Sequence, residues 1–528
     1  MSKVAAYLRG HIGGEVSTRD DVRMALTTDA GILEIKAEMV IYPRSTNDLR
    51  KITRFAWQLA DKGHVMPLTT RGAGTDCTGA AVGKGALIVT AAHLDTIFEY
   101  DAKQRLVRLQ PGVTVAALNG ALGLHGTAVM PLVGADRQGT VGGAIASSAA
   151  GIYAGKYGSI DRAVEQLEIV LANGDVLQTG RVSKKELGRK KGLQGFEGDI
   201  YRGIDGIIEE YADVLDTLKA NDAAGYNIIA DVKQKDGSFD LTPLFIGSQG
   251  TLGIISEMIL KAEFRGTHLS TATLVFATDM AARDALDDLA ATNPAFLEYF
   301  DAELFDIAAN QGKVYPWYDD AAKQLKPASV VIVGFDEFNA KHRTKRLKQL
   351  VKRYGQAEDA MLTTAENEAA DDVVAALDVL AYSTTPDTGG TATALYSGFH
   401  VPTARLEEFI GALRELALRE HHSLPLAGHV ITNTYGIYPR LDLKKVGDKQ
   451  KSLKLLDELT KLVYACGGTM IAEGGEGRLK ARSVYAELDP RVVEMYAAVR
   501  KVCDPLGTLN PGVKEPNDLR TVVAQIRS

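Results

Sequence analysis

Three glycine-rich segments of the chain have residue types that could bind an anionic group of a ligand. They are residues 69–79 (TTRGAGTDCTG), 131–158 (PLVGADRQGTVGGAIASSAAGIYAGKYG) and 246–256 (IGSQGTLGIIS). Glycine lets a backbone approach a ligand closely, and exposed amides at a helix start bind phosphate groups. In the longest segment, Thr140-Val141-Gly142-Gly143 precedes small residues, 144–150, that can start a helix. The alternative for this segment is a tightly packed helix with glycine turns and no ligand.

The spacing of the glycines argues against two common nucleotide-binding motifs. None of the segments has the GxxxxGK[ST] pattern of a P-loop. Residues 71–75, RGAGT, look like the start of a dinucleotide fingerprint, but they lack the third glycine and the acidic residue expected about twenty positions later. A nicotinamide-dependent Rossmann enzyme is therefore disfavoured.

The order of the segments resembles the FAD-binding domain of the vanillyl-alcohol oxidase and p-cresol methylhydroxylase family. The chain is most similar to the glycolate oxidase and D-lactate dehydrogenase branch. The motifs that carry this resemblance span nearly the whole chain: YPRST (42–46) with Asp48-Leu49, RGAGT (71–75), GTVGG (139–143), Tyr157-Gly158, VLANG (170–174), GSQGTLG (247–253) and LNPG (509–512). The resemblance implies an α+β fold, with a two-subdomain FAD-binding domain of the p-cresol methylhydroxylase type and an α+β cap domain with an antiparallel sheet.

The resemblance also implies a domain order and a set of FAD contacts. The expected regions are an N-terminal arm (1–35), an FAD-binding domain (36–265), a cap or substrate domain (266–488) and a C-terminal segment that returns to the FAD site (489–528). The expected cofactor-binding residues are Pro43, Arg71, Gly72, Ala73, Gly74, Thr75, Asp76, Gly79, Pro131, Gly134, Thr140, Val141, Gly142, Gly143, Ser147, Gly151, Tyr157, Gly158, Gly250, Gly253, Ile254, Ile255 and Asn510. Some relatives attach FAD through a His or Cys, which the RGAGT loop and residues 157–160 do not offer, so we expect non-covalent FAD.

Relatives that act on 2-hydroxy acids place a metal site and a base in the cap domain. They use a Gly-His segment, a second His and a Glu-His pair. Here the first histidine is His429, the second position falls at about Tyr435, and the pair reads Glu473-Gly474. Zinc normally has three or four protein ligands. We therefore take His429, Tyr435 and Glu473 as candidate catalytic residues and expect no tightly bound metal.

Several of these residues have a second interpretation that the sequence leaves open. His429 could be a hydrogen-bonded histidine of the cap domain, and Arg71 could form a surface salt bridge instead of neutralising a phosphate. Glu476 is a weak substitute for the lost ligand, and Arg440 and Arg478 are anion contacts or structural residues. No arginine matches the expected contact of a substrate carboxylate, because residues 379–385 read VLAYSTT.

Apolar periodicity and turn residues predict the elements that position these groups. In the first half we expect a helix near 20–26, a strand from Met39, a helix capped by Thr46 or Asn47 and ended by Gly63, strands at 65–68, 86–91 and 105–110, a helix at 115–122, a hairpin of 163–171 with 176–179, a polar loop at 184–191, a helix at 203–218 and a strand at 257–264. In the second half we expect strands at 269–277, 328–335, 395–401 and 430–438, and helices at 280–291, 340–354, 403–420 and 449–464. Strands that alternate with helices favour an antiparallel sheet covered by helices.

Composition indicates an ordinary globular protein. Of the 528 residues, 45% are hydrophobic and 24% are charged, and the net charge of -7 without a basic block argues against nucleic acid as a partner. Three cysteines are too few for a disulfide framework and fit a reducing cytoplasm. Residues 1–30 do not read as a signal peptide, and no apolar run approaches the length of a membrane helix.

The combined interpretation is a cytoplasmic FAD-dependent oxidoreductase that oxidises an alcohol or a 2-hydroxy-acid-like small molecule by hydride transfer to the flavin. Its electron acceptor is unknown, and peripheral membrane contact and a homodimer stay open. The alternative is a flavin-binding subunit or a degenerate homologue with a binding role.

Overall fold

The computed structural model describes residues 2–134, 138–219, 221–266, 268–384, 391–392 and 394–527. The chain divides into two compact units. The first unit contains residues 1–150, 159–263 and 470–528, and the second contains residues 151–158 and 264–469. Residues 470–488 therefore group with the first unit, although the expected cap domain included them, and residues 151–158 group with the second.

A small sheet of the first unit holds the strand that leads into the RGAGT loop. Its order is β1 (Glu15–Ser17), β2 (Met39–Tyr42), β4 (Ala86–Val89) and β3 (Leu68–Arg71), and β2, β4 and β3 are parallel. The helix α3 (Thr46–Asp61) begins at Ser45, whose side chain accepts a hydrogen bond from the Asp48 amide. Burial of Leu49, Ile52 and Ala56 packs one face of α3 into the core that includes β2 and β4, as its helical spacing predicts.

A second sheet of the first unit is antiparallel. Its order is β5 (Ile97–Asp101), β6 (Leu106–Leu109), β10 (Ile254–Lys261), β8 (Val164–Val170) and β9 (Val176–Gln178). The strands β8 and β9 form the hairpin that Asn173-Gly174 predicts. The other helices and strands of this unit are α1 (Ser2–His11), α2 (Asp20–Met24), α4 (Val115–Gly123), β7 (Thr127–Ala128), α5 (Val141–Ala146), α7 (Lys184–Lys191), α8 (Phe196–Glu210), α9 (Ala212–Leu215), α10 (Thr242–Phe245), α19 (Ala481–Tyr485), α20 (Pro490–Cys503) and α21 (Leu519–Ala524).

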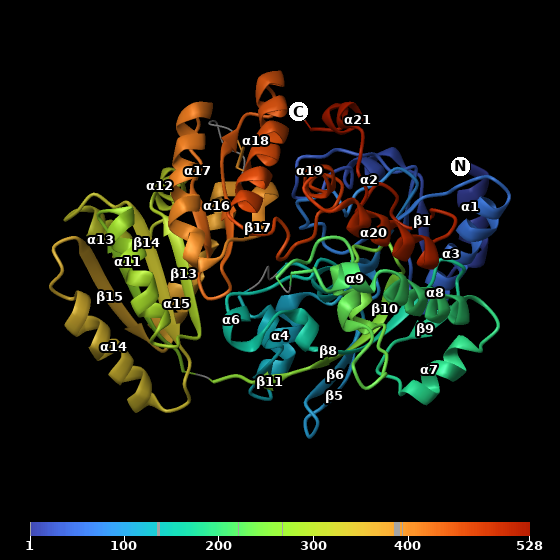
Figure 1. Ribbon diagram of the computed structural model, residues 1–528, viewed down its shortest axis with the longest axis horizontal. Helices are drawn as coiled ribbons and strands as arrows, with labels where there is room; N and C mark the ends of the chain where they lie inside the picture. The colour runs from blue at the N-terminus through green and yellow to red at the C-terminus, as the bar shows by residue number, and fades with distance from the viewer. Residues whose placement is uncertain are drawn as a thin grey trace. The chain divides into compact units, whose positions relative to one another are not determined.

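The second unit is built on a seven-stranded antiparallel sheet. Its order is β15 (Ala360–Glu366), β12 (Ser270–Phe276), β14 (Ser329–Phe335), β13 (Phe296–Asp301), β18 (Leu426–His429), β19 (Thr434–Ile437) and β17 (Ser397–His400). Every residue of β12, β13 and β14 is buried. This confirms the expected antiparallel sheet covered by helices, and Figure 1 shows β13, β14 and β15 beside α11 and α14.

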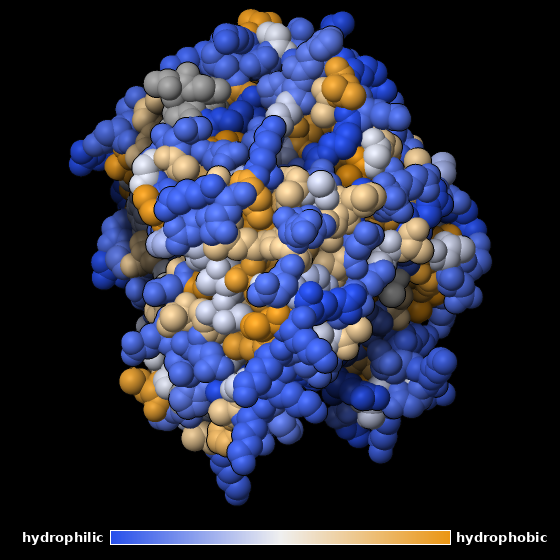
Figure 2. Space-filling view, turned by 90° about the vertical axis from the view of Figure 1, so that its left-hand side faces the viewer, coloured by the Kyte–Doolittle hydropathy of each residue, from blue (hydrophilic) through white to orange (hydrophobic). Residues whose placement is uncertain are grey.

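The helices of the second unit are α6 (Ala154–Tyr157), α11 (Asp279–Ala290), α12 (Glu303–Asn310), α13 (Pro316–Ala322), α14 (Ala340–Tyr354), α15 (Glu368–Ala375), α16 (Val379–Thr384), α17 (Leu406–Glu420) and α18 (Val446–Ala465). Two short strands, β16 (Thr391–Ala392) and β20 (Arg440–Leu441), pair with each other, and β11 (Glu263–Phe264) lies where the chain passes between units. Lysine side chains cover the outer face of α14, and Figure 2 shows a largely hydrophilic surface on this side of the molecule. Among the described residues, no helix is long and apolar enough to cross a membrane.

Several elements differ from the sequence prediction for identifiable reasons. Residues 184–191 form the helix α7 instead of a loop, because Ser183 and Glu186 make a capping box. The strand expected at 65–68 lies at 68–71, since Val65 is exposed beyond the turn at Gly63. The strand expected at 430–438 begins later, because residues 430–433 form the turn between β18 and β19, with Asn433 at a left-handed φ of 55°. The strand β13 and the helix α1 were not expected.

Candidate active site

The RGAGT loop follows β3 directly and presents its backbone. Arg71 ends the strand, and in the part of the chain that the structure describes, the N–H groups of residues 72–76 donate no hydrogen bond. Gly74 has a φ of 79°, which favours glycine. A run of amides without protein acceptors fits the phosphate groups of a dinucleotide cofactor. The residues therefore fit the pyrophosphate of FAD.

Arg71 lies beneath this loop and is buried. Its guanidinium donates to the carbonyl oxygens of Thr28 at 2.8 Å and Ala81 at 3.4 Å. A Cβ added to Gly74 would lie 2.2 Å from the Arg71 Nη2 atom, so a larger residue there would force the buried Arg71 side chain to shift. The surface salt bridge considered for Arg71 is wrong, because the residue is buried and its guanidinium donates to backbone carbonyl oxygens. Burial lowers the pKa of this guanidinium, and nearby Asp29 and Asp76 offset part of that effect.

Two carboxyl groups lie beside Arg71. Asp76 accepts hydrogen bonds from the amides of Thr78 and Ala80, each at 2.9 Å, and so folds the end of the loop. Asp29 is buried, and its pKa is raised well above the ordinary value by burial and by the nearby Asp76 charge.

The Thr140-Val141-Gly142-Gly143 segment has a different local structure. The amides of Val141 and Gly142 donate to the carbonyl oxygens of Val113 and Pro111, and the Gly143 amide donates to the Thr140 Oγ1 atom at 3.2 Å. These backbone donors are therefore used inside the protein and do not offer the phosphate cradle that we expected. Gly142 is required for packing, since a Cβ there would lie 2.4 Å from the Cβ of Pro111.

Gln249 and Asn510 join the glycine-rich segments to the C-terminal part of the first unit. Gln249 donates to the Thr78 hydroxyl at 3.3 Å and accepts from the Gly477 amide at 2.9 Å. Asn510 donates to the carbonyl oxygens of Gln249 and Ala80. Both residues have left-handed φ values, 51° and 42°. Non-glycine residues in this region persist where the surrounding contacts determine them, which often occurs at ligand sites.

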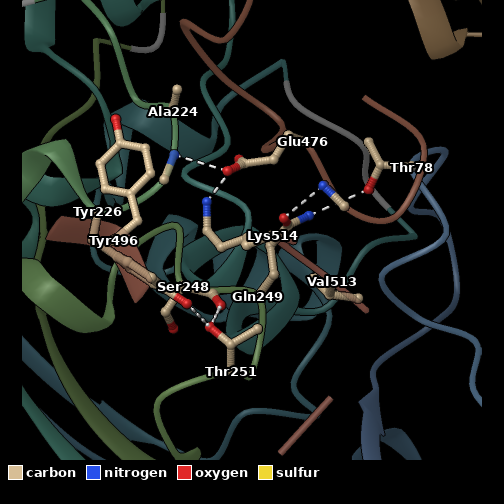
Figure 3. A network of polar contacts seen from close by, with 12 residues as sticks. Thr78, Ala224, Tyr226, Ser248, Gln249, Thr251, Glu476, Tyr496, Val513 and Lys514 are labelled. Atoms are coloured by element: carbon tan, nitrogen blue, oxygen red, sulfur yellow. Dashed lines mark hydrogen bonds and ion pairs between the residues drawn. The ribbon is translucent and has the colours of Figure 1, made fainter. Parts of the chain in front are cut away.

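A fully buried ion pair supports this network, as Figure 3 shows. Lys514 Nζ lies 2.7 Å from Glu476 Oε2, and the other oxygen of Glu476 accepts hydrogen bonds from the Gly225 amide and the Tyr485 hydroxyl. The Lys514 ammonium also lies 5.5 Å from the ring centroid of Tyr226. Glu476 is therefore a structural partner of Lys514. Both of its carboxylate oxygens are bound inside the protein, which argues against the hypothesis that Glu476 replaces a lost metal ligand.

Arg478 is a structural residue of the same region. Its guanidinium donates to the carbonyl oxygens of Val82 and Pro511 and to Asn510 Oδ1. Burial lowers its pKa to about 10, which leaves it charged at neutral pH.

The other expected cofactor residues fall into three groups. The first group lies in loop segments or beside them in the first unit: Pro43, Gly79, Pro131, Gly134, Ser147 and Gly250. The second group lies at the start of β10: Gly253, Ile254 and Ile255. The residues Gly151, Tyr157 and Gly158 belong to the second unit, where the Tyr157 hydroxyl donates to Asp336 at 2.8 Å. Residues 135–137 of the longest glycine-rich segment lie outside the described residues.

His429 is paired with a carboxylate on the neighbouring strand. Its Nδ1 atom lies 2.6 Å from Glu298 Oε2, and the two residues are direct partners in the register of β18 and β13. The Glu298 side chain is 3% exposed, whereas that of His429 is 26% exposed. A buried carboxylate on Nδ1 fixes the orientation of the ring and leaves Nε2 as the atom that can exchange a proton with a ligand.

Tyr435 lies on the opposite face of the sheet from His429. The register pairs Gly428 with Tyr435 and His429 with Thr434, and successive side chains of a strand alternate between faces. The Tyr435 ring contacts Phe399, which in turn contacts Phe409 of α17, so Tyr435 is part of the apolar core. Burial raises its pKa above the ordinary value. The structure therefore does not bring Tyr435 together with His429.

The metal site that the resemblance implies does not fit this chain. The position of the second histidine is taken by Tyr435, which points into the core, and Gly474 has no side chain at the position of the last one. Glu473 lies in the segment that precedes α19. Within the described ranges, no group of three or more His, Cys, Asp or Glu residues could hold a metal ion.

Sequence reasoning missed Glu298. It lies in the run FLEYFD of β13, all of which is buried. A carboxylate inside an apolar run is a signal, because buried acidic residues are normally paired. The carboxylate-binding position near residues 379–385 also stays without an arginine, and Thr385 lies outside the described residues.

The first unit has a loop of open amides after a parallel strand, an arrangement that fits a dinucleotide cofactor. The second unit is built on an antiparallel sheet that carries a carboxylate-paired histidine. Comparison with known proteins agrees. Residues 37–180 match the model of an FAD binding domain, and residues 266–513 match the C-terminal domain of FAD linked oxidases. The chain belongs to the FAD-linked oxidases, is an oxidoreductase, and uses FAD.

Individual relatives are distant but extensive. The glycolate oxidase subunit GlcD of Bacillus subtilis is 25% identical, with 92% of this chain and 91% of that protein covered. D-2-hydroxyglutarate dehydrogenase of Haemophilus influenzae is 24% identical, with 95% of this chain covered, but the chain spans only 50% of that protein. The structure of 4-ethylphenol oxidase from Gulosibacter chungangensis has a TM-score of 0.68 at 15% identity, with 98% of both chains covered, which supports the p-cresol methylhydroxylase type of fold.

Proposed function

We propose that this oxidoreductase oxidises the CH–OH group of a small hydroxy acid, with His429 as the proton acceptor. The observation that carries the proposal is the hydrogen bond between His429 Nδ1 and Glu298 at 2.6 Å. Relatives that are named for glycolate and D-2-hydroxyglutarate support the substrate class. The RGAGT loop binds FAD without a covalent bond in this proposal, and bound FAD supplies a hydride acceptor.

The protein side of the reaction is a proton transfer. Loss of a hydride from the carbinol carbon leaves a carbonyl group only if the hydroxyl proton also leaves. His429 Nε2 takes that proton, and Glu298 stabilises the imidazolium ion that forms because its carboxylate lies on Nδ1. Burial of Glu298 keeps water from weakening this contact. Tyr435 has no role in this proton transfer, because it lies on the opposite face of the sheet.

The experiment compares flavin reduction and turnover in wild type with Glu298→Gln and His429→Ala. His429→Ala should lower kcat by about 10²–10⁴-fold, the range for loss of a general base. Glu298→Gln should lower kcat by a smaller factor, and Glu298→Asp should restore part of it. Tyr435→Phe is the matched control, because it removes a buried hydroxyl on the other face. Wild-type kcat in His429→Ala would refute the assignment of the base.

A second candidate function is a flavin-binding subunit without oxidation chemistry. The observation that favours it is the misfit of the metal site, since Tyr435 and Gly474 replace two expected histidines. The same samples distinguish the two functions. A panel of hydroxy acids that never bleaches the flavin absorbance of the wild-type protein would favour the binding role, whereas bleaching by any of them supports the enzyme.

A further inference from the structure

The seven-stranded sheet of the second unit has an open edge at β15. This strand stands at the end of the strand order, with β12 as its neighbour. Whereas β12, β13 and β14 are buried throughout, most of β15 is half-buried, and Thr364 and Glu366 are exposed. Figure 1 shows β15 on the outer side of the sheet, with α14 beside it. The edge of β15 is therefore a surface on which another strand can pair.

The alternation of backbone hydrogen bonds identifies the groups that face this edge. At one end of the β12–β15 ladder, the Ala277 amide donates to the Asp359 carbonyl oxygen, and at the other end the Asn367 amide donates to that of Leu269, each at 2.8 Å. Bonded and non-bonded pairs alternate along an antiparallel ladder. The odd-numbered residues of β15 therefore bond β12, and the even-numbered residues turn their N–H and C=O groups outward: Ala360, Leu362, Thr364 and Glu366. Over the residues that the structure describes, these four amides donate no hydrogen bond.

The other ends of the three larger sheets have the protections that soluble proteins use against strand pairing. The strands β1 and β9 have three residues each. The strands β5 and β17 contain shifts of register, and β17 is also bridged to Thr469. The strand β3 is bridged to Leu509. In contrast, β15 has seven residues, a regular register and one charged residue, Glu366, at its end.

The helix α14 follows the length of β15 on one face of the sheet. The Thr344 hydroxyl donates to Glu366 Oε1 at 3.3 Å, so the start of the helix lies near the end of the strand. Near the other end of α14, the Tyr354 ring packs edge to face on Phe276, which the register places opposite Ala360. The helix and the strand are therefore antiparallel.

An exposed apolar residue of α14 lies beside the middle of β15. Val351 follows Thr344 by seven residues, so both lie on the side of the helix that faces the strand. The helical rise puts Val351 roughly 10 Å from Thr344, which equals about three strand residues and reaches the level of Thr363. Val351 is 48% exposed. The exposed lysines of α14 lie on the face that points away from the sheet: Lys341, Lys345, Lys348 and Lys352.

We propose that β15 pairs antiparallel with β15 of a second copy of this chain, about a two-fold axis at Thr363. A strand that pairs antiparallel with itself makes the symmetric contact that a homodimer requires. Leu362 then lies opposite the partner's Thr364, and Ala360 lies opposite the partner's Glu366, so each of the four outward residues gains two backbone hydrogen bonds. The two copies of Val351 meet across the axis. This inference does not depend on the proposed function.

Other registers of the same pairing fit less well. With the axis at Leu362, Glu358 would lie opposite the partner's Glu366, and directly opposed like charges are destabilising. With the axis at Thr364, Ala360 would lie opposite residue 368, which belongs to α15 and not to the strand. The axis at Thr363 uses all four outward residues and opposes no like charges.

Sedimentation velocity of the FAD-loaded protein over a range of concentrations tests the association. Thr364→Pro removes an outward N–H from an exposed residue and leaves the bonds to β12 in place, and Thr364→Val is its matched control. Val351→Lys places two like charges at the axis, and its control is Leu418→Lys, at a residue of α17 that is 76% exposed. We expect a wild-type dimer, a dissociation constant at least tenfold higher in Thr364→Pro and Val351→Lys, and less than a threefold change in both controls.

Cysteine cross-linking tests the register. At the axis, Thr363→Cys places two thiols directly opposite each other, so mild oxidation should give a disulfide-linked dimer on a non-reducing gel. Met361→Cys is the matched control on the same face of β15. Its two copies would lie roughly 14 Å apart along the strands, beyond the roughly 7 Å between Cα atoms that a disulfide spans. The wild type controls for the native cysteines.

Three results would each overturn the inference. They are a wild-type monomer at every concentration, wild-type dimer affinity in both Thr364→Pro and Val351→Lys, and equal cross-linking in the two cysteine variants. Circular dichroism and flavin content check the folding of each variant. Because Val351 is an exposed helix residue, Val351→Lys keeps the test decisive if Thr364→Pro does not fold.

Discussion

Lys514 and Glu476 form a fully buried ion pair. Lys514 Nζ lies 2.7 Å from Glu476 Oε2, and neither side chain is exposed to solvent. The pair joins the segment after Asn510 to the turn that precedes Arg478. Gln249 reaches the same turn through the Gly477 amide, so the pair supports the residues that hold the end of the RGAGT loop.

The first prediction concerns this pair. Lys514→Met should lower the free energy of unfolding by about 3–5 kcal/mol, because it leaves the Glu476 carboxylate buried without its cation. The double variant Glu476→Gln with Lys514→Met should recover most of that loss, since no charge stays unpaired. Urea denaturation measures both.

The matched control for this prediction is Lys461→Met, which removes a cation from the exposed pair with Glu458 at 3.6 Å. It should change the free energy of unfolding by less than about 1 kcal/mol, as exposed pairs do. A double variant as unstable as Lys514→Met would show that the geometry of the pair, not its charge balance, matters.

The second prediction compares two glycines with similar backbone angles. Gly74 and Gly126 have φ values of 79° and 65°, so alanine strains the backbone at both. A Cβ at Gly74 would collide with Arg71, whereas a Cβ at Gly126 has no atom within 4 Å. Gly74→Ala should therefore release FAD at least tenfold more readily than Gly126→Ala, measured by the flavin fluorescence that appears on dilution. Equal FAD retention in the two variants would contradict a cofactor role for the loop.

The sequence predicted the motifs of the first unit better than the geometry of the second. RGAGT and Asn510 depend on local turns and short-range spacing, and their residue types alone indicate a loop near a cofactor. The position of Tyr435 depends on the turn at Asn433, which the sequence did not predict. That turn sets the register of β19, and the register decides which residues share a face with Tyr435. Glu298 could not be connected to His429 from the sequence, because 131 residues separate them.

A third prediction concerns pH. Burial raises the pKa of Asp222 to about 6, against 3.8 for an unperturbed aspartate. The folded state therefore holds this proton more tightly than the unfolded state, so the contribution of Asp222 to stability is fully present below about pH 4 and is lost as pH rises to about 6.

Asp222→Asn removes this loss and can still accept the hydrogen bond from the Ala224 amide. At pH 7 the variant should be more stable than the wild type by up to about 3 kcal/mol, at 1.36 kcal/mol for each pKa unit, and the gain should vanish near pH 4. Urea titrations of both proteins at several pH values measure the difference. A gain that is the same at pH 4.5 and pH 7 would mean that the charge of Asp222 is not its cause.

The last prediction concerns metal. A divalent ion bound to the carboxylate and hydroxyl of a 2-hydroxy acid would favour ionisation of the hydroxyl, but it needs several side-chain ligands. In this chain Nδ1 of His429 is held by Glu298, Tyr435 points into the core, and Gly474 offers no ligand. We therefore expect purified protein to contain much less than one equivalent of zinc or manganese and to keep its turnover after dialysis against a chelator. Elemental analysis and assays before and after chelation measure this. Near-stoichiometric metal, with activity lost to the chelator and restored by the ion, would show that other residues rebuild the site, and His429 would then have to be a ligand instead of the base.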